Sequence, residues 1–550
     1  MGRRLRQIQS SLRILGGTTA LVMGSGVAAL ALSSSVGPNG IDARRLHAEP
    51  YNVTGAKIAI GQVEIGRPSQ FGLDKVANAD LPVNVRRVFL LDELAGPNRY
   101  VDFHAATVAS VMVSQDKDLT GVAPNAVLYS AAVGPIRGRS GQPDECLSSQ
   151  QIALSNGGDV RAINFSFGEP LARDPRPEAV LDGNALLTRC IDWSALEHDT
   201  LYVIAGNQGG GGIPIPTDNF NGINVAYSRR VDGRFTKVDF ANLSSEPTFN
   251  SRRGSAPESN VGARRSINLV APGSDIEVIG PDGASSTVSG TSFAAPHVVA
   301  AVALLQEWGD RQLRSGRLDW SLDSREPMVT KAVLLNSADK LEDAGDGLRL
   351  GMRRALYAES DRPWIESDAY RDRAIPLHAD LGTGHLNAYR AVLQLDGGQW
   401  SPDETVPVLG WNYGAIAAPV PTATTEHRHD QFHDYVFEGP LQAGSYLSAT
   451  LAWERLVALN DDNQNERYDL GESFSDQGLN NLDLYLMRVE DTDIADSVWS
   501  SVSAEDSVEH IFTQIPATGQ YKLRVVYHDA VNAAPTQPYA LAWWAVAAQQ

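Results

Sequence analysis

One serine in the 550-residue sequence stands at the start of a helix that the residue pattern predicts to be buried. Ser292 lies in the octapeptide 290–297, GTSFAAPH, and residues 298–305 behind it are almost all small or aliphatic. A helix that is apolar all round is a buried helix. Pro296 is tolerated only near the helix start, where backbone N–H groups have no intrahelical partner. Those N–H groups could stabilise an oxyanion beside Ser292, which predicts a nucleophile, although most serines at such positions only cap the helix.

The octapeptide, with the apolar helix behind it, resembles the serine motif GTSxAxPH of the subtilisin-like serine peptidases. The resemblance implies that Ser292 is the nucleophile and that an acid and then a histidine precede it in the chain. His104 is the candidate histidine, because residues 103–110, FHAATVAS, open an apolar helical stretch similar to the family's HGTxVA segment. Ala105 and Ala106 replace the Gly and Thr of that segment. The alternative is a core or capping histidine.

The candidate acid departs from the family pattern, in which a buried strand ends in Asp-Thr-Gly. Residues 58–66 read IAIGQVEIG, so Glu64 stands at the Asp position. A glutamate can accept the histidine Nδ1–H and stabilise the imidazolium, as Ser-His-Glu triads on other folds do. Asp74 and Asp102 are the competing acids, but neither ends an apolar strand. We therefore expect Glu64 to support His104.

Two further segments resemble substrate-binding parts of the family. The apolar strand 201–205 leads into Gly206 and Asn207, which is similar to the segment whose Asn side chain donates to the developing oxyanion. The alternative for Asn207 is an ordinary turn residue before a Gly-rich stretch. Ser166, Phe167 and Gly168 resemble the strand and turn whose backbone pairs with the substrate on the non-prime side.

The elements that must position these residues alternate between strand and helix. Short β-prone runs at 57–60, 127–130, 162–165 and 201–204 are separated by helical patterns at 104–114, 147–156 and 191–198, and helices at 328–338 and 386–395 follow. Alternation of this kind predicts a parallel sheet with helices on its faces, an α/β fold. The resemblance implies the subtilisin-like three-layer sandwich for a peptidase domain over 57–396.

From about residue 400 the pattern becomes β-rich. Short runs of alternating apolar residues are separated by turns rich in Gly, Pro and Asn, which predicts an all-β, jelly-roll-like sandwich over 400–550. Similar domains are appended to some subtilisin-like peptidases.

The N-terminus predicts export. Three arginines before residue 7 precede a weakly apolar run from Ile14 to Leu32 that contains an Ala-x-Ala site. We interpret 1–32 as a signal peptide, or alternatively as an uncleaved membrane anchor, and 33–56 as a short linker. The protein is then secreted, periplasmic or otherwise extracellular, with membrane contact only if the anchor is retained.

The composition limits the partners. The formal net charge is −20 and 20% of the residues are charged. A protein that grips nucleic acid needs clustered Lys and Arg to neutralise phosphates, so nucleic acid is excluded as the main partner. Protein or peptide substrates are expected instead.

An acidic stretch in the C-terminal region has the spacing of a calcium loop. Side chains at positions 1, 3, 5, 9 and 12 of an EF-hand-type loop, and the carbonyl at position 7, would bind the ion. The corresponding residues are Asp461, Asn463, Asn465, Asp469, Glu472 and Arg467. Glu466 replaces the usual Gly at position 6, and the alternative is a solvated acidic loop. Structural calcium is the only cofactor expected.

The two cysteines and a group of three histidines give weaker predictions than the motifs above. Cys146 and Cys190 are the only cysteines, and in an oxidising compartment they permit one disulfide or remain two buried thiols. His427, His429 and His433 fit no single helix face, so we expect surface histidines rather than a metal site.

These features together predict a secreted serine endopeptidase that hydrolyses peptide bonds through an acyl-enzyme on Ser292. The altered acid and the alanines after His104 leave one alternative, a catalytically inactive relative that acts as an extracellular binding module.

Overall fold

The computed structural model describes most of the chain. The described residues are 35–69, 81–136, 140–206, 215–238, 264–343, 348–358, 361–402, 404–419 and 431–546. Several predicted features lie outside them: the signal or anchor segment, Asp74, Asn207, His427 and His429.

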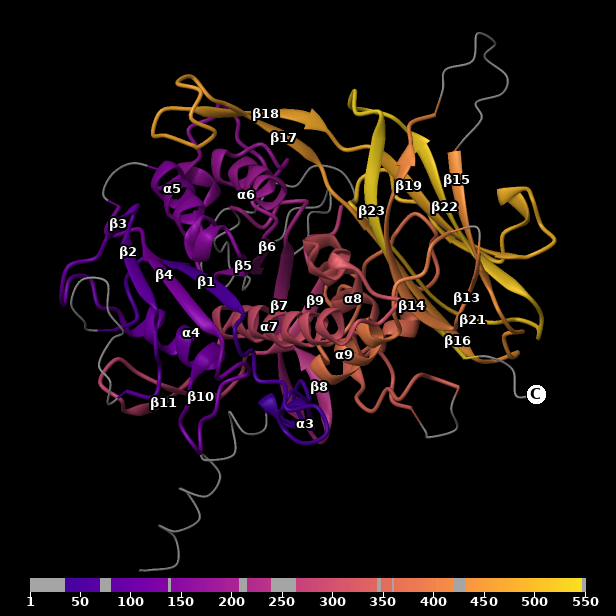
Figure 1. Cartoon of the computed structure of the whole chain (residues 1–550), viewed down its shortest axis with the longest axis horizontal. Coiled ribbons are helices and arrows are strands. Elements are labelled where there is room, and N and C mark those ends of the chain that lie inside the picture. The colour runs from indigo at the N-terminus through magenta and orange to yellow at the C-terminus, as the bar shows by residue number, and fades with distance from the viewer. Residues whose placement is uncertain are drawn as a thin grey trace, which may run out of the picture.

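A ten-stranded sheet forms the centre of the α/β domain (Figure 1). Along its edge-to-edge path the order is β12-β8-β7-β6-β5-β1-β4-β2-β3, and β9 pairs with β7. All neighbours from β2 through β4, β1, β5 and β6 to β7, and the β7–β9 pair, are parallel. The strands are β1 (Ala59–Glu64), β2 (Arg87–Leu90), β3 (Glu93–Leu94), β4 (Val127–Ala132), β5 (Val160–Phe165), β6 (Leu201–Ala205), β7 (Ile223–Val231), β8 (Arg234–Lys237), β9 (Leu269–Pro272) and β12 (Leu356–Tyr357).

Helices cover both faces of this sheet, because neighbouring residues of a buried strand point to opposite sides. Ile60 packs into the core that contains α4 and α7, whereas Ala59 and Val63 pack into the core beneath α5 and α6. The helices are α4 (Phe103–Val113), α5 (Gln142–Ala153), α6 (Leu186–Glu197), α7 (Thr291–Ser315), α8 (Pro327–Asn336) and α9 (Ala388–Asp396). The predicted three-layer α/β sandwich with a mainly parallel sheet is confirmed.

The segment before the sheet is part of this domain. Val36, Ile41, Leu46 and Val53 are fully buried in the core that contains α7, and the short helix α3 (Arg44–His47) lies among them. The linker expected over 33–56 was therefore wrong from Ser35 onward. A second small element, the hairpin of β10 (Ile276–Ile279) and β11 (Ser285–Val288), packs beside α4.

The C-terminal region is a sandwich of two mainly antiparallel sheets around a separate apolar core. One sheet has the order β13-β15-β22-β19-β20 and the other β14-β23-β16-β21. The strands are β13 (Thr405–Val406), β14 (Leu409–Ala417), β15 (Gln431–Phe437), β16 (Tyr446–Trp453), β19 (Asn481–Arg488), β20 (Trp499–Ser501), β21 (Val508–Gln514), β22 (Tyr521–Asp529) and β23 (Thr536–Ala545). The all-β prediction for this region is confirmed.

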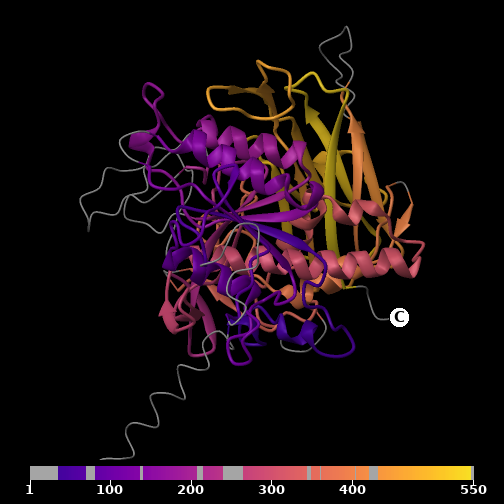
Figure 2. The same cartoon turned by 60° about the vertical axis from the view of Figure 1, so that its left-hand side comes forward.

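The two regions pack side by side, as both views show (Figures 1 and 2). Helix α8 lies against β16 and β23, and the Asn336 side chain at its end accepts a hydrogen bond of 2.8 Å from Ser448. A hairpin of β17 (Leu456–Asn460) and β18 (Ser473–Gly478) leaves the sandwich and packs on α6. These are two of the places where the sandwich packs on the α/β domain.

Cys146 and Cys190 form a disulfide that joins α5 to α6. Tyr468 and Phe474, from the hairpin and its loop, pack in the same apolar cluster. Of the two possibilities that the sequence left open, the structure has the bridge.

No helix within the described ranges combines the length and the apolar character needed to cross a membrane.

Candidate active site

The carboxylate of Glu64 and the imidazole of His104 meet at one edge of the sheet. Glu64 is the last residue of β1, and His104 is the second residue of α4. Glu64 Oε2 lies 3.0 Å from His104 Nδ1. The carboxylate is buried, whereas 39% of the His104 side chain is exposed. One ring nitrogen is thus held by the acid and the other remains available for proton transfer.

The competing acid Asp102 has a different position. It is the N-cap of α4, and its carboxylate accepts a hydrogen bond of 3.0 Å from the backbone N–H of Ala105. Satisfying an unpaired helix N–H is the usual task of an N-cap aspartate. Asp102 therefore begins the helix that carries His104, and the structure brings Glu64, not Asp102, to the imidazole.

The surroundings of His104 favour its protonated form. Burial lowers the pKa of His104, but the charge of Glu64 and its hydrogen bond raise it, and the charge of Asp102 adds to this. The net result is a pKa above the ordinary value of 6.5. An imidazolium formed by proton transfer would therefore be stabilised in place.

Ser292 lies at the beginning of α7, as predicted. Gly290 is the N-cap, with a φ of 146° that disfavours any side chain, and Ser292 is the second helical residue. Its hydroxyl donates to the carbonyl of Ser166 at 3.1 Å. The next residue, Phe293, has its ring centroid 5.7 Å from that of His104. The serine and the histidine thus share one edge of the sheet, and the Ser292 hydroxyl is directed at the Ser166 carbonyl.

The segment 166–168 is held against the serine. The Ser166 hydroxyl donates to the backbone carbonyl of Ser292 at 2.8 Å, and it accepts a bond of 2.8 Å from the Asn164 side chain. Asn164 is fully buried in β5 and was not among the predicted site residues. A polar residue inside a buried strand is the signal that could have identified it as a positioning residue.

Asn207 lies outside the described residues, but the strand that leads to it does not. β6 ends at Ala205 beside the end of β5, and the N–H of Gly206 bonds to Val225 at 2.9 Å. The chain therefore leaves β6 at the same sheet edge that carries Glu64 and Ser166.

Comparison with known proteins agrees with this arrangement. The model of the subtilase family, Peptidase_S8, matches residues 52–352. The chain belongs to the subtilase family. It is 27% identical over 290 residues to subtilisin NAT of Bacillus subtilis subsp. natto and to subtilisin E of Bacillus subtilis (strain 168), covering 52% of this chain. The match spans 65% of the length of those two relatives. A subtilisin of Bacillus pumilus is 26% identical over 290 residues, with 90% of its length covered.

Among solved structures, the prenylagaramide maturation protease PagA aligns with a TM-score of 0.39 and 19% identity, over 64% of this chain and 97% of that one.

The histidine of the serine motif, His297, does not join Glu64 and His104. His297 is fully buried in α7, where its Nδ1 bonds to the Phe293 carbonyl at 2.7 Å and its Nε2 lies 3.0 Å from Ser35 Oγ. Burial lowers the pKa of His297 to about 4, so it stays neutral. It fastens the N-terminal segment to the helix that carries Ser292.

The predicted calcium residues of this subtilase lie in the loop between β17 and β18, without flanking helices. Asp461 accepts the backbone N–H groups of Asn465 and Glu466, and Glu472 accepts those of Asp462 and Asp469. The Asn463 and Asn465 amides converge on one oxygen of Asp469, at 2.7 and 2.8 Å. Across the described parts of the chain, no group of three or more His, Cys, Asp or Glu side chains is arranged to hold a metal.

The third histidine of the polar group, His433, is in the described part of β15. Its Nδ1 lies 2.7 Å from the hydroxyl of Tyr539, which also bonds to Tyr435. The imidazole is half-buried and lies against a fully buried tyrosine.

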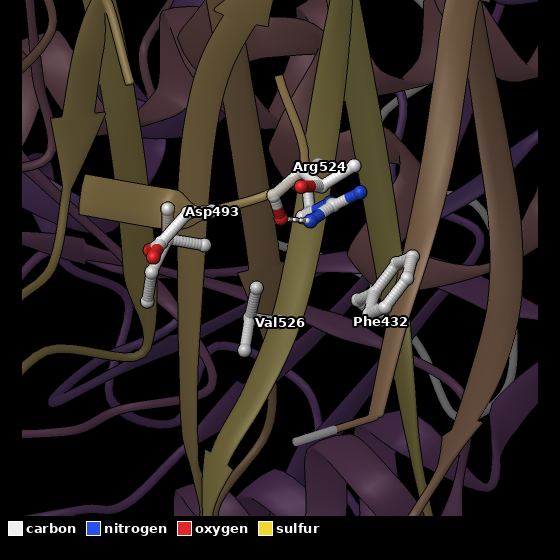
Figure 3. A pocket seen from close by; sticks show the side chains of 6 residues that line it. Phe432, Asp493, Arg524 and Val526 are labelled. Carbon is white, nitrogen blue, oxygen red and sulfur yellow. Dashed lines mark hydrogen bonds between the residues drawn. The ribbon is translucent and has the colours of Figure 1, made fainter. Parts of the chain in front are cut away.

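The subtilase also has a hollow of about 380 Å³ on the β-sandwich, remote in sequence from Ser292 (Figure 3). Arg524 and Phe432 both line it, and the guanidinium carbon lies 3.9 Å from the centroid of the Phe432 ring. The guanidinium donates to both oxygens of Asp434 and to the Thr492 carbonyl. Each nitrogen of the guanidinium therefore donates at least one hydrogen bond, which fixes the arginine in the sandwich.

Proposed function

We propose that this subtilase is a serine endopeptidase that hydrolyses peptide bonds through an acyl-enzyme on Ser292. One observation carries the proposal: the 3.0 Å contact of Glu64 with His104 Nδ1, at the sheet edge where Ser292 begins α7. This contact fixes the imidazole tautomer that leaves Nε2 free to act as a base.

The roles follow from the positions of the groups. His104 Nε2 takes the Ser292 proton as the hydroxyl oxygen attacks the peptide carbonyl, and Glu64 stabilises the imidazolium. The Ser292 N–H at the helix N-terminus, with the Asn207 side chain, would stabilise the oxyanion. His104 then returns its proton to the departing amine, and a water activated by the same histidine hydrolyses the acyl-enzyme.

Substrate binding is proposed for the backbone of Ser166, Phe167 and Gly168, which adjoins the nucleophile. A protein or peptide substrate would extend along this segment and place its scissile carbonyl beside Ser292. The stacking of Phe165 on Phe167, with ring centroids 5.1 Å apart, supports a fixed position for the segment.

A fluorophosphonate probe tests the nucleophile. We expect labelling of Ser292 in the wild type, loss of labelling in Ser292→Ala and His104→Ala, and cleavage of casein by the wild type only. Mass spectrometry of the labelled peptide identifies the residue. A folded wild-type protein that neither labels nor cleaves would favour the alternative, an inactive extracellular binding module.

We also propose that the protein is exported, on the basis of the basic and then apolar segment before residue 33. Cell fractionation with N-terminal sequencing distinguishes a cleaved signal from a retained anchor. A mature protein that begins near residue 32 supports the signal, and a full-length protein in the membrane fraction supports the anchor.

We propose calcium as a structural ion for the loop 461–472, because the sequence places oxygen-bearing side chains at the spacing of a calcium loop. Asp461, Asp469 and Glu472 supply carboxylates, and rotation of the Asn463 and Asn465 amides would turn their oxygens inward. Calcium is expected to raise the midpoint of thermal unfolding, and Asp461→Ala with Glu472→Ala should abolish that increase. Isothermal titration with calcium alone, showing no heat above the double variant, would contradict the proposal.

A further inference from the structure

A second polar side chain of β1 lies next to the contact between Glu64 and His104. Gln62 is fully buried two residues before Glu64, so both side chains point from the strand toward α4. Its amide nitrogen donates to the backbone carbonyl of Ala105, at 3.3 Å, and to the hydroxyl of Ser130 in β4, at 3.1 Å. Ala105 directly follows His104 in the first turn of α4. Gln62 therefore joins the strand of the acid to the helix of the histidine.

The sheet register places Gln62 in the middle of a buried polar row. Gln62 pairs with Ser130 of β4 on one side and with Asn164 of β5 on the other. All three residues are fully buried. Asn164 donates to the Ser166 hydroxyl, which donates to the backbone carbonyl of Ser292. The row is thus connected to α4 through its glutamine and to α7 through its asparagine.

Packing and stability do not explain a glutamine at this position. Its Oε1 is buried and has no hydrogen-bond partner among the described residues. A buried polar atom without a partner destabilises the fold, and an apolar side chain of the same shape would avoid that cost. The Ala105 carbonyl does not depend on Gln62 for a donor, because inside an α-helix it accepts the N–H of the residue four positions further on. The glutamine therefore calls for another role.

Gln62 and Glu64 cross the same gap between β1 and α4. Their side chains have equal length, and Glu64 Oε2 reaches His104 Nδ1 at 3.0 Å where the Gln62 amide reaches the Ala105 carbonyl at 3.3 Å. Both contacts join neighbouring positions of the strand to neighbouring positions of the helix. A change in the separation at Gln62 therefore changes the distance from Glu64 to His104. That contact fixes the imidazole tautomer and stabilises the imidazolium, and it weakens as it lengthens.

We propose that Gln62 is a positioning residue for the peptidase reaction, because it holds α4 at the separation from β1 at which Glu64 meets His104. This inference rests on the peptidase function proposed above. Gln62 touches neither the substrate nor the reacting atoms, and it acts through the backbone of Ala105.

Gln62→Met tests the role, because methionine has a similar length but cannot donate a hydrogen bond. With a peptide substrate we expect kcat to fall about tenfold and KM to stay within about twofold, because the separation affects the chemical step. The urea midpoint should stay near that of the wild type, because the unpartnered oxygen is removed together with the two bonds. Gln62→Leu gives the same comparison with a second apolar side chain.

The pH profile is a readout that a purely structural role would not move. The charge of Glu64 and its hydrogen bond raise the pKa of His104, against burial, and the charge of Asp102 adds to this. A longer contact weakens the influence of Glu64 and leaves Asp102 in place. The acidic limb of kcat/KM in Gln62→Met should therefore move to lower pH than in the wild type.

A buried glutamine far from the site is the matched control. Gln394 in α9 is 2% exposed, and its amide nitrogen donates to the carbonyls of Gly410 and Trp543, at 2.9 and 2.8 Å. Gln394→Met should lower the urea midpoint, because these carbonyls and the Asn336 amide lose a partner. It should leave kcat and the acidic limb unchanged. The opposite patterns of the two variants separate positioning from general stabilisation.

A double-mutant cycle shows whether Gln62 acts through the contact of Glu64 with His104. In the wild-type background, Gln62→Met should slow fluorophosphonate labelling of Ser292 about tenfold. In the Glu64→Gln background the contact is already impaired, so the same substitution should slow labelling less than about twofold.

Two results would overturn the positioning role. One is an active wild type beside a folded Gln62→Met or Gln62→Leu variant with unchanged kcat and an unchanged acidic limb. The other is an equal loss from Gln62→Met in the presence and in the absence of Glu64. A wild type that neither labels at Ser292 nor cleaves any peptide is a different result, because it removes the peptidase function itself and the positioning role with it.

Discussion

At the residue scale, the candidate site differs from the family pattern in its acid, because Glu64 stands where the pattern has the shorter Asp. Glu64 has one methylene more than Asp, yet its Oε2 reaches His104 Nδ1 at 3.0 Å from the end of β1. Asp102, two residues before the histidine, is occupied by the helix N-terminus. The two acids therefore have separable roles, one electrostatic and one structural.

Replacing each acid should separate those roles. Glu64→Gln keeps the shape but removes the charge and allows the wrong imidazole tautomer, so kcat should fall about 10³–10⁴-fold. Asp102→Ala removes a helix cap and should cost about 1 kcal/mol of stability, with most of the activity retained. Steady-state kinetics and urea unfolding of both variants measure this. A crippled Asp102→Ala beside an active Glu64→Gln would contradict the assignment.

The pH profile gives a second measurement at this scale. His104 must be neutral to act as a base, and its pKa lies above 6.5, so kcat/KM should rise with pH through a midpoint above that value. Glu64→Gln removes the largest influence that raises this pKa, and burial continues to lower it, so the midpoint should move to lower pH. An acidic limb that stays in place in the residual activity of Glu64→Gln would show that the limb belongs to another group.

At the element scale, the pair α5–α6 covers one face of the central sheet and is fixed from two sides. The Cys146–Cys190 disulfide joins the two helices. The loop between β17 and β18 adds the Tyr468 carbonyl, which accepts a bond of 3.0 Å from Gln150. Strand β18 adds the Phe474 ring, whose centroid lies 5.4 Å from that of Trp193. Elements from the sandwich therefore help to hold both helices in place.

Removing the disulfide should destabilise the folded protein. The bridge spans 44 residues, and a loop of that length gives about 2–4 kcal/mol of stabilisation by restricting the unfolded chain. Cys146→Ser with Cys190→Ser should lower the urea midpoint accordingly. A reducing agent should lower the midpoint of the wild type but not of the double variant; equal effects on both would contradict the prediction.

At the scale of the whole molecule, the two regions share buried charges and not only apolar surface. Arg455, from the sandwich, is 2% exposed and reaches into the α/β domain. Its Nη2 donates to the fully buried Asp192 at 2.7 Å and to the Gly183 carbonyl at 2.8 Å. Trp411 and Ala542 of the sandwich belong to the same core as α7. We expect the two regions to unfold together.

Breaking this buried pair tests the coupling. Arg455→Met leaves the Asp192 charge buried without its cation, which should cost about 3–5 kcal/mol. The exposed pair of Arg325 with Asp310 is the matched control, and Arg325→Met should cost less than about 1 kcal/mol. Calorimetry should show one transition in all three proteins. Two separate transitions in the wild type would contradict the coupling.

The sequence by itself determined the features that depend on residues close together in the chain. Three elements could be predicted from consecutive residues alone: the apolar helix behind Ser292, the strand that ends in Glu64 and the helix that begins near His104. A buried helix or strand is apolar over consecutive residues, so the pattern is visible in a short stretch of sequence. The alternation of strands and helices, and the later β-rich pattern, fixed the classes of both regions for the same reason.

Only the tertiary structure decided which distant groups meet. Glu64 and Asp102 were both available to His104, and the choice depended on the packing of β1 against α4. Residues 33–56 were interpreted as a linker because they are the short stretch between the N-terminal apolar segment and the first strand. In the structure, Ser35 Oγ lies 3.0 Å from the Nε2 atom of His297, 262 residues further along. Burial is set by the surface that a segment meets in space, and that surface comes from residues far away in the chain.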